Sequence, residues 1–168
     1  GKSTILNQIY IAEAIAQGYK AFLFSGELVG GNVKYWLLQT LANEEQFAEY
    51  IARDGHKYKK VTIQSKEKII EDIKDKFFLY DNDDYRIESI IDKMTILAKR
   101  YNVRVFVIDN LMTLESTVKD KYEAETDIVK KLKSFAKKYN ALVHLVAHPR
   151  KSINEEIEKE IGRASCRE

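Results

Sequence analysis

Cysteine and proline are almost absent from this sequence, which has one of each in 168 residues. A single cysteine, Cys166, excludes an intramolecular disulfide and a cysteine-cluster metal site. Its scarcity is typical of a protein from a reducing cytoplasm. The chain also lacks any apolar run long enough to span a bilayer. We therefore expect a cytoplasmic protein without a membrane partner.

The charged residues lack a dominant sign. Lysine and arginine total 28 and the acidic residues 26, which leaves a net charge of +2. The bulk composition therefore does not indicate nucleic-acid binding, and any such binding must come from local loops. Hydrophobic residues make up 45% and charged residues 32% of the chain, which is typical of a folded globular protein. The length suits one domain.

The last eight residues differ from the rest of the chain. They read IGRASCRE and contain the only cysteine, and they resemble the translated read-through of a sequencing adapter. We therefore interpret residues 161–168 as a non-native tail and residues 1–160 as a partial domain, truncated at both ends.

Apolar residues alternate along the chain between helical spacing and short continuous runs. Helices are expected over residues 3–17, 33–53, 66–76 and 87–101 and around residues 128–139, and strands over residues 20–25, 77–80, 103–109 and 141–147. Residues 56–65 receive no assignment. This alternation predicts an α/β fold in which helices flank a mostly parallel sheet. In such folds, ligands bind beyond the carboxyl ends of the strands.

The chain begins with Gly1, Lys2, Ser3 and Thr4, the second half of the phosphate-binding pattern G-x-x-x-x-G-K-[ST]. A helix N-terminus attracts anions, and Lys2 would add a full positive charge. The Ser3 hydroxyl would be a ligand of Mg²⁺. The alternative is a solvated terminus, because so short a motif also arises by chance. The first half of the pattern would supply much of the N–H cradle, so we expect the chain alone to bind ATP weakly and to be inactive.

Acidic residues follow two of the expected strands. Asp109 ends the strand VFVID, a pattern typical of the Walker B carboxylate that lies beside Mg²⁺, usually through water. The alternative is a turn aspartate. Glu27 follows the first strand in the sequence SGEL and is a candidate to orient or deprotonate the water that attacks a γ-phosphate. The alternative is an acid in the first turn of the next helix.

Two histidines belong to the last expected strand. His148 follows it directly and is a candidate to bind the γ-phosphate and to report its presence, although a histidine at a strand end can also be structural. His144 lies inside the strand, and we interpret it as a core histidine with satisfied hydrogen bonds and no function.

Basic residues occur in two loops that would leave the same edge of the sheet. The loop at 115–122 contains Lys119 and Lys121, and the segment after His148 contains Arg150 and Lys151. These residues are candidates for contact with the phosphates of single-stranded DNA. They are equally well explained as ordinary solvated charges.

The sequences GKST, FSGEL, VFVIDNLMTLE and HLVAHPRK, in this order, resemble the RecA-like ATPase core of hexameric replicative DNA helicases of the DnaB and Twinkle type, including phage helicases. The resemblance implies that ATP, or another NTP, is bound with Mg²⁺ by Gly1, Lys2, Ser3, Thr4, Asp109 and His148. It implies catalytic roles for Glu27, Lys2 and His148. It also implies a hexameric ring that moves along single-stranded DNA in a bacterium or a phage-infected cell.

Two other functions remain open on the sequence. One is a RecA-like, RadA-like or clock-type ATPase that hydrolyses ATP without unwinding DNA. The other is a structural or regulatory subunit that binds nucleotide without turnover and in which Glu27 is incidental. A small-molecule kinase is disfavoured, because no separate basic lid for an acceptor is visible.

Overall fold

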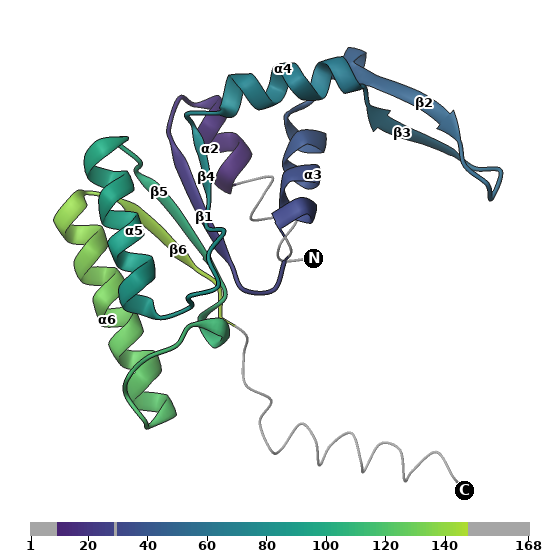
Figure 1. Cartoon of the computed structure of the whole chain (residues 1–168). Helices are drawn as coiled ribbons and strands as arrows, with labels where there is room; N and C mark the ends of the chain where they lie inside the picture. Colours follow the sequence, from purple (N-terminus) through teal and green to yellow (C-terminus); the bar gives the residue numbers. More distant parts are fainter. Residues whose placement is uncertain (1–9, 29, 148–168) are drawn as a thin grey trace, which may run out of the picture.

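A four-stranded sheet forms the centre of the molecule (Figure 1). The structure is a computed structural model, and it describes residues 10–28 and 30–147. The strands of the sheet are β1 (Ala21–Ser25), β4 (Phe77–Leu79), β5 (Val105–Asp109) and β6 (Leu142–Leu145). They lie in the order β4-β1-β5-β6, and all three pairings are parallel. The predicted α/β fold with a mostly parallel sheet is confirmed.

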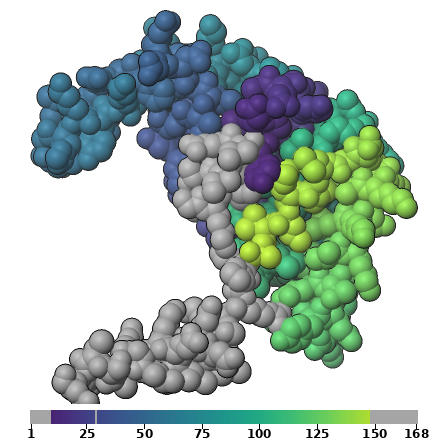
Figure 2. Space-filling view, turned by 180° about the vertical axis from the view of Figure 1, so that it is seen from behind, coloured from purple at the N-terminus to yellow at the C-terminus, as the bar shows by residue number. Residues whose placement is uncertain are grey.

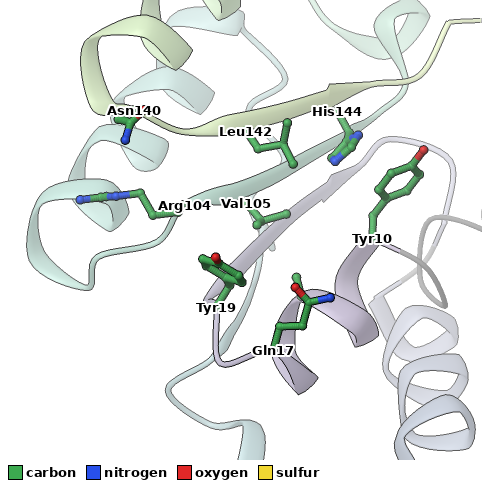
Figure 3. Close-up of a pocket in the computed structure, with 9 residues that line it drawn as sticks. Tyr10, Gln17, Tyr19, Arg104, Val105, Asn140, Leu142 and His144 are labelled. Carbon is green, nitrogen blue, oxygen red and sulfur yellow. The ribbon is translucent and has the colours of Figure 1, made fainter.

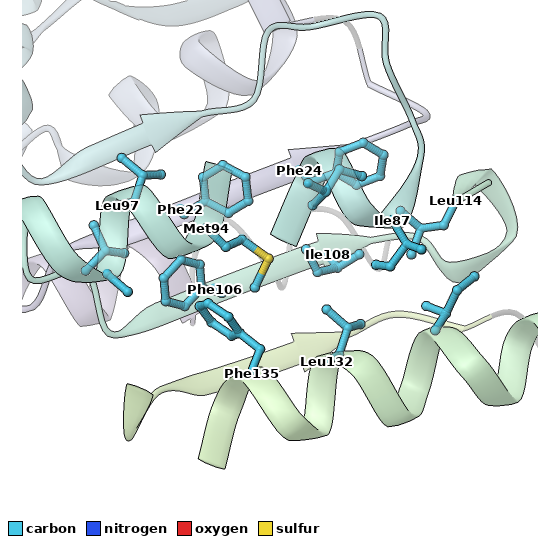
Figure 4. Close-up of a cluster of buried hydrophobic side chains, with 14 residues drawn as sticks. Phe22, Phe24, Ile87, Met94, Leu97, Phe106, Ile108, Leu114, Leu132 and Phe135 are labelled. Atoms are coloured by element: carbon cyan, nitrogen blue, oxygen red, sulfur yellow. The ribbon is translucent and has the colours of Figure 1, made fainter. Parts of the chain in front are cut away.

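Alternate residues of the two central strands face two separate hydrophobic layers. One layer packs against α5 (Ile87–Arg100) and α6 (Lys121–Tyr139), and it contains Phe22, Phe24, Phe106 and Ile108 (Figure 4). The other layer packs against α2 (Glu13–Ala16) and α3 (Gly30–Leu41), and it contains Ala21, Leu23, Val105 and Val107. Strands β1 and β5 are therefore buried on both faces, as continuous apolar runs predict.

Helix α5 confirms the prediction made for residues 87–101. Its buried residues are Ile87, Ile90, Met94, Leu97 and Ala98. They follow one another at intervals of three, four, three and one, the helical spacing on which the prediction rests. In the described part of the helix predicted over residues 3–17, residues 10–12 form a π-helical turn and α2 follows. Gly18 ends this helix with a φ of 85°. Within the described ranges, every helix is too short or too polar to cross a lipid bilayer.

The helix predicted over residues 33–53 is wrong in its second half. Helix α3 ends at Leu41, a short 3-10 turn, η2 (Glu44–Gln46), follows, and strand β2 (Phe47–Ile51) pairs antiparallel with β3 (Lys57–Val61). Phe47, Tyr50 and Ile51 have helical spacing, but in the strand Ile51 is 70% exposed. We call residues 47–61 the β2–β3 ribbon. It projects from α3 and α4 (Ile63–Ile73), which is the helix predicted over residues 66–76 (Figure 1).

Two further boundaries differ from the predictions. Strand β4 lies at an edge of the sheet and is only half-buried, whereas its apolar sequence predicted a buried strand. The loop predicted over residues 115–122 ends earlier, because the Asp120 carboxylate accepts hydrogen bonds from the backbone N–H groups of Tyr122 and Glu123, each at 2.9 Å. This cap starts α6 at Lys121.

Candidate functional site

The carboxyl ends of β1 and β5 are joined directly. Ser25 and Asp109 are register partners, and the backbone N–H of Gly26 donates to the carbonyl oxygen of Asp109 at 2.7 Å. Asp109 is 3% exposed, while Glu27, two residues beyond Ser25, is exposed. The structure therefore places Glu27 and Asp109 at the same edge of the sheet.

A buried asparagine connects the two strand ends. Asn110 is 0% exposed, and its side-chain Nδ2 donates a hydrogen bond to Oε1 of Glu27. Its Oδ1 accepts the backbone N–H of Met112 at 2.8 Å, which caps the 3-10 turn η3 (Leu111–Thr113). Both ends of the Asn110 amide are therefore engaged, and the orientation of the amide is fixed by its two partners. The Asp109–Asn110 peptide bond is cis.

The turns after β1 and β5 pack against each other without room for another atom. A Cβ placed on Gly26 would overlap Oγ1 and Cβ of Thr113, so a glycine is required at this close approach. The Thr113 hydroxyl donates to the carbonyl oxygen of Asn110 at 2.8 Å. On the other turn, Oγ of Ser25 accepts the backbone N–H of Leu28 at 3.1 Å. The two turns thus form one packed unit that carries Glu27.

Strand β6 reaches the same unit. The backbone N–H of Val146 donates to the carbonyl oxygen of Ile108 at 2.9 Å. The backbone N–H of Leu111 donates to the carbonyl oxygen of Val146 at 2.8 Å. His148 follows two residues later but lies outside the described residues. The same is true of Gly1, Lys2, Ser3, Thr4, Arg150 and Lys151. Their roles stay predictions.

The segment after Asn110 runs from the end of β5 to the beginning of α5. The backbone N–H of Glu115 donates to the carbonyl oxygen of Tyr85, and the backbone N–H of Ile87 donates to the carbonyl oxygen of Glu115, both at 2.9 Å. Beyond this attachment, Lys119 lies in the loop and Lys121 is the first residue of α6. Both lysines are exposed, so both are accessible to a partner in solution.

A pocket of about 410 Å³ lies at the opposite ends of the strands (Figure 3). It is lined by Arg104 and Leu142, which stand at the amino ends of β5 and β6, and by Tyr10 and His144. The ring centroids of Tyr10 and His144 are 3.8 Å apart. The pocket is therefore separate from the edge that carries Asp109.

His144 itself differs from its prediction. Its Nε2 is buried and has no hydrogen-bond partner in the part of the chain that the structure describes, and the residue as a whole is half-buried, whereas a core histidine with satisfied hydrogen bonds was expected. Burial lowers the pKa of His144, because desolvation disfavours the charged imidazolium. The His144 ring packs against the ring of Tyr10.

The described residues fit a magnesium ion that is held mainly by phosphate and water. No group of three or more histidine, cysteine, aspartate or glutamate side chains within residues 10–28 and 30–147 could hold a metal ion by itself. Asp109 nevertheless offers a carboxylate at the end of a buried strand. Mg²⁺ is commonly bound in proteins by one or two carboxylates together with substrate phosphates and several waters, and Asp109 suits that arrangement.

No role was predicted for Asn110 or Gly26 from the sequence. The only available signal was the position of Asn110 directly after Asp109, and an asparagine there is also an ordinary turn residue. Its bond to Glu27 joins residues 83 positions apart. No local pattern encodes such a contact.

Comparisons with known proteins agree with this fold. A family model described as an AAA domain matches residues 1–154. The fold is similar to that of a solved structure described as a DnaB-like replicative helicase and its interactions with primase. The TM-score is 0.62 and the sequence identity is 18%. The match covers 86% of this chain and 35% of the helicase chain. No curated protein matches this chain. The predicted resemblance to a DnaB-type helicase core is confirmed at the level of the fold.

Proposed function

The chain belongs to the AAA domain family, and on this premise we propose that it is the ATP-hydrolysing motor domain of a replicative DNA helicase, which couples hydrolysis to translocation on single-stranded DNA. The observation that carries the proposal is the packed unit at the sheet edge, in which Asn110 holds Glu27 beside the end of the Asp109 strand. The DnaB-like helicase of similar fold is itself a replicative helicase.

In this proposal Glu27 acts on the attacking water. Its carboxylate accepts a hydrogen bond from the water and orients it toward the γ-phosphorus. The water oxygen bonds to that phosphorus, the bond to the β–γ bridging oxygen breaks, and ADP, phosphate and a proton are released. Asn110 donates to Oε1 of Glu27, which holds the carboxylate in a defined direction. Such positioning lowers the barrier because the geometry is set before the reaction.

The other proposed roles concern the nucleotide. Mg²⁺, when bound, neutralises charge on the phosphate oxygens. The residues that would hold it are Ser3 and Asp109, the latter through water. Gly1, Lys2, Ser3 and Thr4 would hold the phosphates of ATP or another NTP, with Lys2 supplying positive charge in catalysis, and His148 would contact the γ-phosphate.

The proposed partners are single-stranded DNA and further copies of the same chain. Lys119, Lys121, Arg150 and Lys151 would contact DNA phosphates. The protein would act as a hexameric ring in the cytoplasm of a bacterium or a phage-infected cell. The match spans only 35% of the helicase chain, so ring assembly and DNA movement are properties to be tested on the protein encoded by the complete gene.

The test is the rate of ATP hydrolysis by that protein, with and without single-stranded DNA. DNA is expected to raise the rate, and Glu27→Gln is expected to lower kcat by about a hundredfold or more, the typical range for a general base. The matched control is Glu67→Gln, the same change at an exposed position of α4, with kcat unchanged. A rate indifferent to DNA together with full turnover by Glu27→Gln would overturn the proposal.

A strand-displacement assay on a forked duplex separates helicases from related ATPases. ATP-dependent displacement of the labelled strand supports the proposed motor. DNA-stimulated hydrolysis without displacement would instead identify a recombinase-like or clock-type ATPase. Nucleotide binding without hydrolysis would identify a structural or regulatory subunit.

A further inference from the structure

The β2–β3 ribbon carries an aromatic pair on one of its faces. Tyr50 and Tyr58 are register partners on the two strands, and their ring centroids are 5.9 Å apart. They are 47% and 44% exposed. Lys60 lies on the same face, because alternate residues of a strand share a face, and its Nζ is 5.8 Å from the centroid of Tyr50. The face thus presents two half-exposed rings beside a cation.

The turn of the ribbon holds one of the two rings, that of Tyr58. The Tyr58 hydroxyl donates to Oδ2 of Asp54 at 2.8 Å, and Oδ1 of Asp54 accepts the backbone N–H of His56 at 3.0 Å. Gly55 adopts a φ of 79° between them, a conformation that glycine allows without strain. Tyr58 is therefore ordered before any partner binds, and little conformational entropy is lost on binding.

The ribbon also carries the excess positive charge of the chain. Residues 47–61 contain four basic and two acidic residues, a net charge of +2, which equals the net charge of all 168 residues. The rest of the chain is therefore neutral overall. Three of the four cations, Lys57, Lys59 and Lys60, lie on β3. Lys60 shares the face of the two rings, whereas Lys57 and Lys59 lie on the other face of the strand, so positive charge borders the aromatic pair on both faces of this element.

We propose that the β2–β3 ribbon binds single-stranded nucleic acid, with bases stacked on Tyr50 and Tyr58 and phosphates contacted by the lysines of β3. Aromatic side chains on a basic surface bind single strands with little sequence preference, because every base has a flat face that stacks. A protein partner fits less well, since lysine is depleted at protein interfaces.

The ribbon is a separate surface from the loop that contains Lys119. The ribbon extends beyond α4 at one end of the molecule, whereas that loop precedes α6 at the other end (Figure 1). Seen from behind, the ribbon again stands clear of the main body (Figure 2). Its binding therefore goes beyond the proposed function and does not depend on ATP hydrolysis.

The test is the affinity of the 168-residue chain for fluorescein-labelled oligothymidylate and oligouridylate, measured by fluorescence anisotropy. The double variant Tyr50→Ala/Tyr58→Ala is expected to raise Kd by about tenfold or more. The matched control is Tyr35→Ala, on α3 and 48% exposed, with Kd unchanged. The two oligonucleotides distinguish DNA from RNA as the preferred strand. No binding of either one by the wild-type chain would overturn the proposal.

A second variant removes two of the charges and keeps both tyrosines. Lys57→Gln/Lys60→Gln is expected to reduce the slope of log Kd against log salt concentration by about 1.4, or 0.7 per phosphate contact. Lys99→Gln, an exposed change on α5, serves as control and should leave the slope unchanged. This variant decides the question if the tyrosine variant fails to fold, as judged by circular dichroism.

Two further outcomes would contradict the proposal. Both ribbon variants could bind oligonucleotides as the wild type does. Alternatively, they could change the sedimentation coefficient of the protein while leaving Kd unchanged, which would identify the ribbon as a contact between protein copies. In the protein encoded by the complete gene, the rate of ATP hydrolysis without DNA is expected to stay unchanged in both variants, so failure here is distinguishable from failure of the proposed function.

Discussion

The side-chain Nδ2 of Asn110 donates a hydrogen bond to Oε1 of Glu27 across the ends of two adjacent strands. Because Oδ1 of Asn110 already accepts the N–H of Met112, the amide presents its nitrogen rather than its oxygen to the carboxylate. The turn after β5 thereby positions an acidic residue that belongs to the turn after β1.

Replacement of Asn110 is expected to slow ATP hydrolysis without weakening nucleotide binding. In the protein encoded by the complete gene, Asn110→Ala should lower kcat by about 10- to 150-fold, since a hydrogen bond to a charged group contributes about 1.5–3 kcal/mol. KM should stay the same, because Asn110 contacts Glu27 rather than the nucleotide. Steady-state kinetics measure both constants. The control is Asn32→Ala, at an exposed position of α3, and an unchanged kcat for Asn110→Ala would contradict the positioning role.

A side chain at Gly26 is expected to destabilise the fold. In Gly26→Ala the new Cβ would overlap Thr113, and such overpacking typically costs about 1–3 kcal/mol. Urea denaturation measures the change in the free energy of unfolding. Gly31→Ala is the matched control, because a Cβ there meets no atom within 4 Å and the change removes a helical glycine, which stabilises by about 0.4–1 kcal/mol.

The overlap can also be relieved from the other side. Thr113→Gly removes the side-chain atoms that a Cβ on Gly26 would meet. The double variant Gly26→Ala/Thr113→Gly is therefore expected to lose less stability than the sum of the two single changes, since contacting sites are not additive. Strict additivity would show that the two turns do not compete for the same space.

Lys131 is expected to stabilise the packing of α6 on α5. Its Nζ is 2.5 Å from Oε1 of Glu88 on α5 and 2.6 Å from Oδ2 of Asp127 on its own helix. Lys131→Gln should lower the free energy of unfolding at pH 7 by about 0.5 kcal/mol, a typical value for exposed ion pairs, because the side chain of Glu88 is 46% exposed. Lys133→Gln, an exposed change on α6, should have no effect.

The same ion pairs predict a pH dependence. Hydrogen bonding to Lys131 lowers the pKa of Glu88, and hydrogen bonding to Asp127 and Glu88 raises the pKa of Lys131. The contribution of Glu88 is present above its unfolded pKa of about 4.3 and is lost as the pH falls through its lower folded pKa. The contribution of Lys131 is present below about 10.4 and is lost as the pH rises through its higher folded pKa.

Urea denaturation at three pH values checks this window. The stability difference between the wild type and Lys131→Gln is expected to be largest at pH 7. It should shrink at acid pH below the range of carboxylate titration and again at alkaline pH above that of lysine. A difference that is constant across the range would show that Lys131 acts through packing of its apolar stem rather than through its charge.

The sequence predicted those elements whose pattern is repeated many times. Helix α5 presents an apolar residue on one face at every turn from Ile87 to Ala98, and each of the four strands of the sheet is a short apolar run between polar turns. The repeated helical spacing of α5 is satisfied only by a helix, whereas the short apolar runs favour strands through their length and their β-branched and aromatic residues. The boundaries set by single capping contacts, such as Asp120 at the start of α6, could not be read from periodicity.

The ribbon was missed because its residues satisfy two patterns at once. Phe47, Tyr50 and Ile51 are spaced for one face of a helix, and they lie in a five-residue strand equally well. The partner strand at 57–61 decides between the two, since its ladder pairs every residue of β2. The Asp54-Gly55 turn is the typical hairpin signal, and here it outweighed the helical spacing.

The candidate site was predicted only where chemistry and position are local. Glu27 and Asp109 each follow an apolar strand directly, and parallel strands bring such residues to one edge. Asn110 is different, because its importance depends on a contact with a residue 83 positions away. A buried asparagine and a surface turn asparagine have the same sequence signature.

The pairing of Phe47 with Val61 makes the ribbon structurally independent of the central sheet. These two residues are opposite each other at its base. The chain therefore enters and leaves the ribbon at neighbouring positions, and residues 48–60 form an insertion between α3 and α4. Val61 is buried, while β2 and the rest of β3 are largely exposed. A short turn between α3 and α4 could replace this insertion and leave both hydrophobic layers intact. The length and sequence of residues 48–60 can therefore change while the four-stranded sheet and its two hydrophobic layers stay the same.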